Sequence, residues 1–254
     1  AFYDEAFLNA LEWQPGATLK VQEAVSQNWQ RLVTTLVANL LKAVQVHTQD
    51  LEQMNFFEWA KIWPEGTAAS ETESLVGIFV DQKHSIDFYD AKNRVNKIAD
   101  LMGIAFEWVK ADVEELNPWY LPYETAYIMH QGTKVGIAGK VNPAFYHKIS
   151  LGDAFIFELD ASFLSTVHVP YKRFAQIAKY PAITRDVSFL IPLSFTVAQL
   201  QTDIARIDEI ITQVSLVDHF QKPEWVDQKS ITLRIVMQDP HATLESARAD
   251  GIMH

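Results

Sequence analysis

The sequence lacks several features that would assign it to a large class of proteins. It contains no cysteine, which excludes disulfides and thiolate metal sites. No apolar run approaches the roughly 20 residues that a membrane-spanning helix requires, and the first residues have neither the basic nor the apolar region of a signal peptide. No Asn-x-Ser/Thr glycosylation site is present. These absences fit a cytoplasmic protein without a membrane partner, and the missing initial Met fits a segment of a longer chain.

Motifs of enzyme active sites are also missing. The sequence has no phosphate-binding P-loop, no Gly-rich dinucleotide turn, no G-x-S-x-G and no H-E-x-x-H. Its eight histidines are scattered without metal-ligand spacing. Glu58 and Glu158 lie in expected strands and could form a pair of carboxylates, but we interpret both as solvent-facing strand positions. No catalytic residue and no metal ligand is therefore expected.

The charge is acidic and uneven. A net charge of -11 argues against a chain that coats nucleic acid non-specifically. Residues 171–254 hold nine Lys and Arg against ten Asp and Glu, whereas residues 1–170 hold twelve against twenty-two. Any contact with RNA is therefore expected in the last third of the chain.

Hydrophobic periodicity predicts a mixed α+β region, with an antiparallel sheet, in the first 160 residues. A loop is expected over 66–74, a connector over 161–180 and a domain boundary near 170. Either Ser26 or Asn28 is expected to cap the first helix. Three helices are expected, over 29–46, from a cap at Asp87 or Asp90 to Met102 before Gly103, and over 143–149. The expected strands are 55–63, 75–81, 106–108, 126–130, 135–141 and 154–159.

The last segment has the order β-α-β-β-α. The expected elements are a strand over 186–191, a helix from Thr196 to 207, strands over 210–221 and 229–238, and a helix from Thr243. This order is that of a ferredoxin-like split βαβ sandwich, which needs one further strand. The sequence thus predicts such a sandwich, truncated at its C-terminal end.

One short motif lies in the expected hairpin. Gly136-Ile137-Ala138-Gly139 is a G-x-x-G, and glycines inside a strand mark bulges or a close approach of another backbone. We interpret it as a tightly packed strand and not as a binding loop.

The expected open face of the sandwich carries the residues of greatest interest. In a split βαβ sandwich both helices cover one sheet face and leave the other open. Thr232 and Arg234 alternate with the apolar residues of their strand, so they are expected on the open face, and Phe220 with Lys222 ends the neighbouring strand. Stacking, phosphate attraction and polar groups for base edges suit single-stranded RNA. A solvated face with one exposed aromatic is the other interpretation.

Four motifs in the last third resemble a known domain. They are KYPAITRDVS at 179–188, LVDHF at 216–220, KSITLR at 229–234 and DPHATL at 239–244. In this order and spacing they resemble the ferredoxin-fold anticodon-binding domain that ends the phenylalanyl-tRNA synthetase β subunit.

The first 160 residues resemble the class II synthetase-like module of the same subunit. The matching segments are VTTLVANLL at 33–41, NFFEWAKIW at 55–63, IDFYDAK at 86–92, GIAGKVNP at 136–143 and FELD at 157–160. Two departures concern the helix start, where Val33 replaces the family's arginine and Ala38-Asn39 replaces its Pro-Gly. The strand at Phe57-Glu58-Trp59 lacks the arginine with which catalytic class II sites grip ATP.

The resemblance implies a function for both parts. The family's enzyme is an α2β2 heterotetramer that joins phenylalanine to its tRNA with ATP and magnesium, which act on the α subunit. Residues 1–170 are then a non-catalytic module that binds the α subunit, and residues 171–254 an incomplete anticodon-binding domain. No cofactor is expected in this fragment, and its expected partners are the α subunit and phenylalanine tRNA.

Eight residues are candidates for the two contacts. Aromatic residues anchor interface cores, which selects three tryptophans, although each is equally compatible with an ordinary core position. A rival hypothesis is a stand-alone protein-interaction module that never meets RNA. The candidate RNA contacts are Phe220, Lys222, Arg234, Thr232 and Arg185, and the candidate subunit contacts are Trp29, Trp59 and Trp63.

Overall fold

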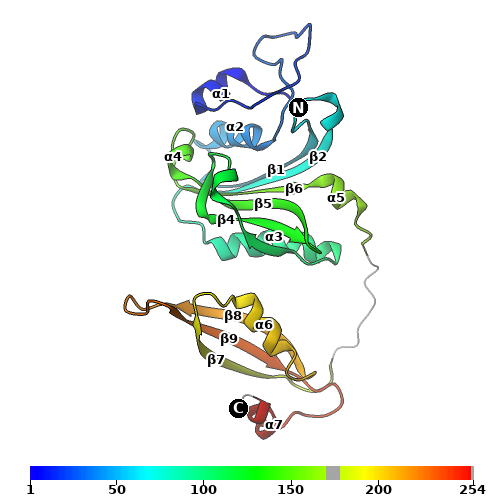
Figure 1. The fold of residues 1–254 in the computed structure, drawn as a ribbon, viewed down its shortest axis with the longest axis vertical. Helices are drawn as coiled ribbons and strands as arrows, with labels where there is room; N and C mark the ends of the chain where they lie inside the picture. Colours follow the sequence, from blue (N-terminus) through cyan, green and yellow to red (C-terminus); the bar gives the residue numbers. More distant parts are fainter. Residues whose placement is uncertain (170–177, 253–254) are drawn as a thin grey trace. The chain divides into compact units, whose positions relative to one another are not determined.

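The computed structural model describes residues 1–169 and 178–252, which belong to two compact units. Each unit is an antiparallel sheet with helices packed on it (Figure 1), so the expected α+β class is confirmed. The domain boundary expected near residue 170 lies outside the described residues. Each unit is considered by itself.

The first unit is built on a six-stranded sheet of order β1-β2-β6-β5-β4-β3, in which every neighbouring pair is antiparallel. Its strands are β1 (Gln53–Ile62), β2 (Thr72–Asp81), β3 (Glu107–Lys110), β4 (Tyr120–His130), β5 (Thr133–Val141) and β6 (Asp153–Asp160). Its helices are α1 (Glu5–Leu11), α2 (Val37–His47), α3 (Phe88–Met102), α4 (Pro143–Tyr146) and α5 (Ala161–Thr166), with short 3-10 turns η1 (Ala68–Ser70) and η2 (Val113–Glu115).

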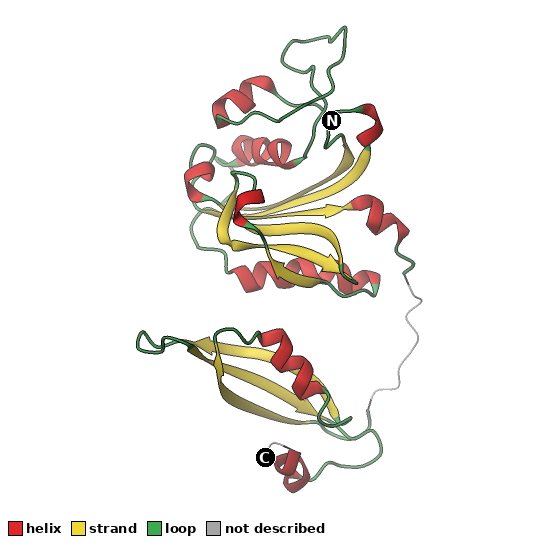
Figure 2. Ribbon diagram, in the orientation of Figure 1, coloured by secondary structure: helices red, strands yellow, loops and turns green. Residues whose placement is uncertain are grey.

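Helices cover this sheet on both faces, and Figure 2 shows α2 and α3 on opposite sides of it. Val76 and Ile78 of β2 pack with the residues of α1 and α2, whereas Leu75 packs with those of α3. A strand buried on both faces reads as a continuous apolar run. The run over 75–81 therefore predicted this strand, although β2 begins earlier, at Thr72, inside the stretch expected to be a loop.

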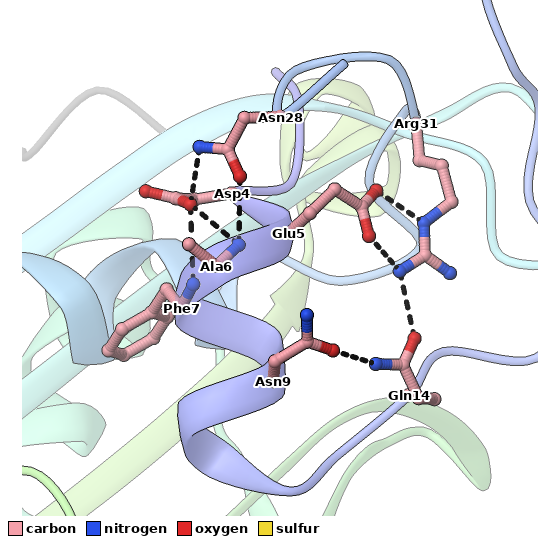
Figure 3. Close-up of polar contacts among 8 residues, drawn as sticks. All are labelled: Asp4, Glu5, Ala6, Phe7, Asn9, Gln14, Asn28 and Arg31. Carbon is pink, nitrogen blue, oxygen red and sulfur yellow. Dashed lines mark hydrogen bonds and ion pairs between the residues drawn. The ribbon is translucent and has the colours of Figure 1, made fainter.

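The start of the first long helix was predicted wrongly. Helix α2 begins at Val37, and its N-cap position is Leu36. Asn28, one expected cap, instead accepts a hydrogen bond at 2.8 Å from the Ala6 backbone N–H at the start of α1. Arg31 donates two hydrogen bonds, of 2.6 and 2.5 Å, to Glu5 (Figure 3). Asn28 and Arg31 therefore stabilise α1 and do not begin a helix of their own. Helix α1 has only seven residues, and the sequence analysis did not predict it.

Other boundaries follow local capping rules. Asp87 accepts hydrogen bonds from the backbone N–H groups of Tyr89 and Asp90 at the start of α3, and Gly103 ends it with a φ of 70°. These expected caps are confirmed. The connector expected over 161–180 is wrong at its start, where Asp160 caps the short helix α5.

The second unit has the expected element order. Its sheet has the order β7-β9-β8, again antiparallel throughout, and α6 begins with a capping box formed by Thr196 and Gln199. The last helix begins at Ser246 and not at Thr243. The elements are β7 (Ile183–Pro192), α6 (Val197–Ala205), β8 (Ile211–Phe220), β9 (Gln228–Met237) and α7 (Ser246–Ile252).

Both helices of the second unit contribute to one core. Ile204 of α6 and Ala249 of α7 belong to the same buried cluster as the alternate residues of β9. Those β9 residues are Ile231, Leu233, Ile235 and Met237. The helices therefore pack on a single face of the sheet, which leaves the opposite face open.

The interpretation of the G-x-x-G motif is confirmed. A Cβ atom on Gly136 would lie 2.4 Å from the carbonyl oxygen of Glu158, and one on Gly139 would lie 2.8 Å from the carbonyl oxygen of Glu124. Both glycines are in β5, so they let the neighbouring backbones approach closely.

We predict that Gly136→Ala lowers the free energy of unfolding by about 1–3 kcal/mol, because the added methyl group meets a backbone that cannot move aside cheaply. Gly16→Ala is the matched control, since a Cβ there meets nothing within 4 Å. Urea unfolding of the two variants measures the difference. Equal stabilities would contradict the close approach.

Candidate nucleic-acid and subunit interfaces

Residues on the open face of the second unit form four rows across its three strands. Directly paired residues of neighbouring strands point to the same face, so the rows follow from the register. From the hairpin end they are Leu190, Ser230 and Phe220; Ser188, Thr232 and Asp218; Asp186, Arg234 and Ser215; Thr184, Val236 and Gln213.

The centre of this face is held by polar pairs. Arg234 donates hydrogen bonds of 2.8 and 2.7 Å to the two carboxylate oxygens of Asp186, and the hydroxyls of Thr232 and Ser188 lie 2.8 Å apart. The Arg234 guanidinium holds the pKa of the Asp186 carboxyl below its usual value, and this carboxylate raises the pKa of Arg234. The charge of Arg234 is therefore compensated within the sheet.

An aromatic pair lies at the hairpin end. Phe220 is 53% exposed, and its ring contacts Trp225 edge to face with 5.9 Å between centroids. Lys222 lies in the turn with its Nζ 5.2 Å from the centre of the Trp225 ring, and its carbonyl accepts a 3.0 Å hydrogen bond from the Trp225 backbone N–H. Trp225 was missed by the sequence analysis; an aromatic inside a polar turn is the signal that could have found it.

Arg185 does not share this face. It pairs in register with Ile235 of the core-facing set, and its Nε donates a 3.0 Å hydrogen bond to Asp250 of α7. The expected RNA contacts are thus divided: Phe220, Thr232 and Arg234 share the open face, and Arg185 lies on the helix-covered one. The alternation of β7 already indicated this separation.

The three candidate tryptophans of the first unit have different surroundings. The Lys42 Nζ lies over the Trp29 ring, 4.4 Å from its centre. Trp63 is partly buried, and its backbone N–H donates a 2.9 Å hydrogen bond to the Val33 carbonyl. Trp59 is 47% exposed on β1, two residues from Phe57, which is 75% exposed. Both therefore point to one face of the strand at the edge of the sheet. Phe57 was not among the sequence candidates.

The solvent-facing interpretation of Glu158 was wrong. Strand β6 lies inside the sheet, and the partly buried Glu158 side chain accepts hydrogen bonds of 2.8 Å from Thr35 and of 2.8 Å from Tyr120. Burial raises the pKa of Glu158. Glu58 is half-buried on the same face, separated from Glu158 by Val76 in the strand register, and burial raises its pKa too.

The described residues contain neither a candidate metal site nor a helix that could span a membrane. Within residues 1–169 and 178–252, no group of three or more His, Asp or Glu side chains is placed to hold a metal ion. None of the helices in this part of the chain has the length and apolar character needed to span a membrane.

Comparison with known proteins assigns both units. A family model described as "Phenylalanyl tRNA synthetase beta chain CLM domain" matches residues 1–161. The chain belongs to the phenylalanyl-tRNA synthetase β-chain family. A second model, "Ferredoxin-fold anticodon binding domain", matches residues 178–254, so the resemblance of both segments is confirmed.

Curated relatives of this family agree with the match. The phenylalanine–tRNA ligase β subunit of Bacillus licheniformis is 26% identical over 83% of the chain and 28% of its own length. That of Francisella tularensis is 27% identical over 89% of the chain and 30% of its length, and that of Dehalococcoides mccartyi is 30% identical over 66% and 20%. The chain thus spans less than a third of the length of these relatives.

We predict that Glu158→Gln reduces the loss of stability at rising pH. A buried carboxyl with a raised pKa binds its proton more tightly in the folded than in the unfolded state. The free energy of unfolding therefore falls as the pH rises from the ordinary value of 4.5 through the raised pKa. Unfolding experiments between about pH 5 and pH 8 test this, with the exposed Glu107→Gln as control. Parallel pH profiles for wild type and Glu158→Gln would contradict it.

Proposed function

We propose that this chain acts as part of the β subunit of a phenylalanine–tRNA ligase, in the ATP-dependent attachment of L-phenylalanine to its tRNA. In this proposal residues 1–170 bind the α subunit, residues 171–254 bind the anticodon region of the tRNA, and the α subunit carries catalysis, ATP and magnesium. Membership of the phenylalanyl-tRNA synthetase β-chain family and similarity to phenylalanine–tRNA ligase β subunits support the proposal.

The single observation that carries the RNA contact is the open sheet face in the segment matched by the anticodon-binding model. Both helices pack on the other face, and the open one presents an exposed phenylalanine beside hydroxyl groups and a guanidinium. Unpaired bases stack on such aromatic rings and hydrogen-bond to such polar groups.

The charge of this segment favours specific over non-specific binding. Nine basic against ten acidic residues in 171–254 provide little long-range attraction for phosphates. We infer that stacking and hydrogen bonds contribute most of the RNA affinity of this unit.

The edge of the first sheet supports the α-subunit contact. Strand β1 is one of the two edge strands of the sheet, so one row of its backbone N–H and C=O groups is available to another chain. Phe57 and Trp59 are exposed on one face of this strand, and aromatic residues of this kind anchor interfaces. All three tryptophans contact groups of their own unit, and the Trp59 Nε1 donates a 3.1 Å hydrogen bond to Glu73. Only Trp59 has a second exposed aromatic, Phe57, on the same face of this edge strand, so this pair carries the proposal.

We predict that Phe220→Ala weakens binding of a phenylalanine tRNA anticodon stem-loop by roughly ten- to a hundredfold, because stacking is worth on the order of 1–3 kcal/mol per base. Fluorescence anisotropy with labelled RNA measures the affinity. Phe57→Ala, an aromatic truncation in the other unit, should bind RNA like wild type. Wild-type affinity in Phe220→Ala would remove this ring from the site, and a wild-type chain that binds no RNA would favour the stand-alone interaction module.

We predict that the double substitution Phe57→Ala and Trp59→Ala weakens association with a bacterial phenylalanyl-tRNA synthetase α subunit by at least about thirtyfold, since anchor residues contribute 2 kcal/mol or more. Co-purification and calorimetry measure the association, and circular dichroism checks the fold. Phe220→Ala serves as the control that should leave assembly unchanged. Undiminished association of the double variant would place the interface elsewhere.

A further inference from the structure

The ion pair on the open face gives Arg234 an unusual position for an RNA contact. Both guanidinium–carboxylate hydrogen bonds to Asp186 are short and well formed, and a bidentate pair of this kind fixes the orientation of the guanidinium plane. The Arg234 side chain is nevertheless 49% exposed. A planar cationic group is thus held in place on the sheet with part of its surface open to solvent.

We propose that Arg234, oriented by Asp186, is a second stacking platform for an unpaired RNA base, in addition to Phe220. This inference rests on the proposed RNA-binding function and specifies how the face is used. Arginine guanidinium planes stack on bases as aromatic rings do, and the attraction includes a cation–π contribution. Asp186 is then a positioning residue, since it acts through Arg234.

A direct phosphate contact is the less favourable use of Arg234. Asp186 occupies the edge of the guanidinium formed by Nε and Nη2 and already compensates its positive charge, so a phosphate at the remaining N–H donors would gain little from Coulomb attraction and would lie near a carboxylate. A base that stacks on the guanidinium plane leaves the ion pair intact. The contact therefore costs no existing hydrogen bond.

The spacing of the two platforms defines the class of ligand. Phe220 is in register with Ser230, which lies four residues before Arg234 on β9, so the two rows are about 13 Å apart at about 3.3 Å per residue. Stacked neighbouring bases are only about 3.4 Å apart. The two platforms therefore take non-adjacent bases of an unstacked single strand.

The row between the platforms suits the intervening base. It contains the paired hydroxyls of Ser188 and Thr232 and the carboxylate of Asp218. These groups hydrogen-bond to base edges and carry no positive charge for a phosphate. The face as a whole fits a single-stranded RNA segment of at least three unstacked bases.

Two substitutions separate a stacking platform from a phosphate contact, measured in the full chain with the anticodon stem-loop RNA. Asp186→Asn removes a negative charge and weakens the hold on Arg234. If Arg234 is a stacking platform, the Asp186→Asn variant binds RNA about three- to tenfold more weakly than wild type. If Arg234 instead contacts a phosphate, the variant binds RNA more tightly and with a steeper salt dependence, because the guanidinium is released from Asp186. Arg234→Lys keeps the charge without the plane, so a platform loses about tenfold in affinity.

The neighbouring Arg185→Lys is the matched control, because Arg185 lies on the other face and pairs with Asp250; it should bind RNA like wild type. Thermal unfolding should show little change in either test variant, since an exposed ion pair contributes little to stability. Wild-type or tighter binding by Asp186→Asn, or wild-type binding by Arg234→Lys, would overturn the inference.

The RNA itself provides a second test. Single abasic nucleotides placed along the loop should abolish the effect of Phe220→Ala at one position and that of Arg234→Lys at another, with at least one nucleotide between them. Adjacent positions would overturn the spacing. If Phe220→Ala weakens binding while both Arg234→Lys and Asp186→Asn do not, this inference alone fails; if Phe220→Ala is also silent, the proposed RNA site fails with it.

Discussion

The alternation of side chains along antiparallel strands is the constraint on which both candidate surfaces depend. In β9 it directs Ile231, Leu233 and Ile235 into the core, so Thr232 and Arg234 must lie on the opposite face. In β1 it directs Phe57 and Trp59 to one side of the edge strand. A shift of one residue in register would reverse these assignments and expose the core, so burial of the apolar set also secures the position of the polar one.

Charge compensation distinguishes the open face from a general nucleic-acid surface. Arg234 is paired with Asp186 and Arg185 with Asp250 on the other face. Attraction to phosphates from a distance is therefore weak, and the proposed contact with RNA depends on stacking and hydrogen bonds that form only when unpaired bases reach the sheet.

In the first unit, one face of the sheet is covered by a buried aromatic and aliphatic cluster. Tyr3, Trp13 and Trp119 form a chain of edge-to-face contacts, with ring centroids 5.8 and 5.1 Å apart, and they belong to or pack against the cluster on the face that contains Glu158. The Glu158 carboxylate is held by Thr35 and Tyr120. A sheet face filled in this way supports the edge strand β1, on which the proposed subunit contact lies.

The sequence by itself determined features that depend on close neighbours or on strict periodicity. These include the order of elements in the second unit, the end of α3 at Gly103 and the close packing at Gly136, whereas the sequence left the cap of α3 open between Asp87 and Asp90. Tertiary structure alone decided features that join distant segments. Asn28 accepts a hydrogen bond from the backbone of Ala6, 22 residues away, so it does not start the expected helix. Glu158 accepts a hydrogen bond from Thr35, 123 residues away, so a carboxylate expected to face solvent is partly buried and hydrogen-bonded. The pairing of Arg234 with Asp186, 48 residues apart, belongs to the same group. Local propensity reflects only the nearest residues, whereas the partner of a charged or polar group is set by which strands the folded sheet brings together.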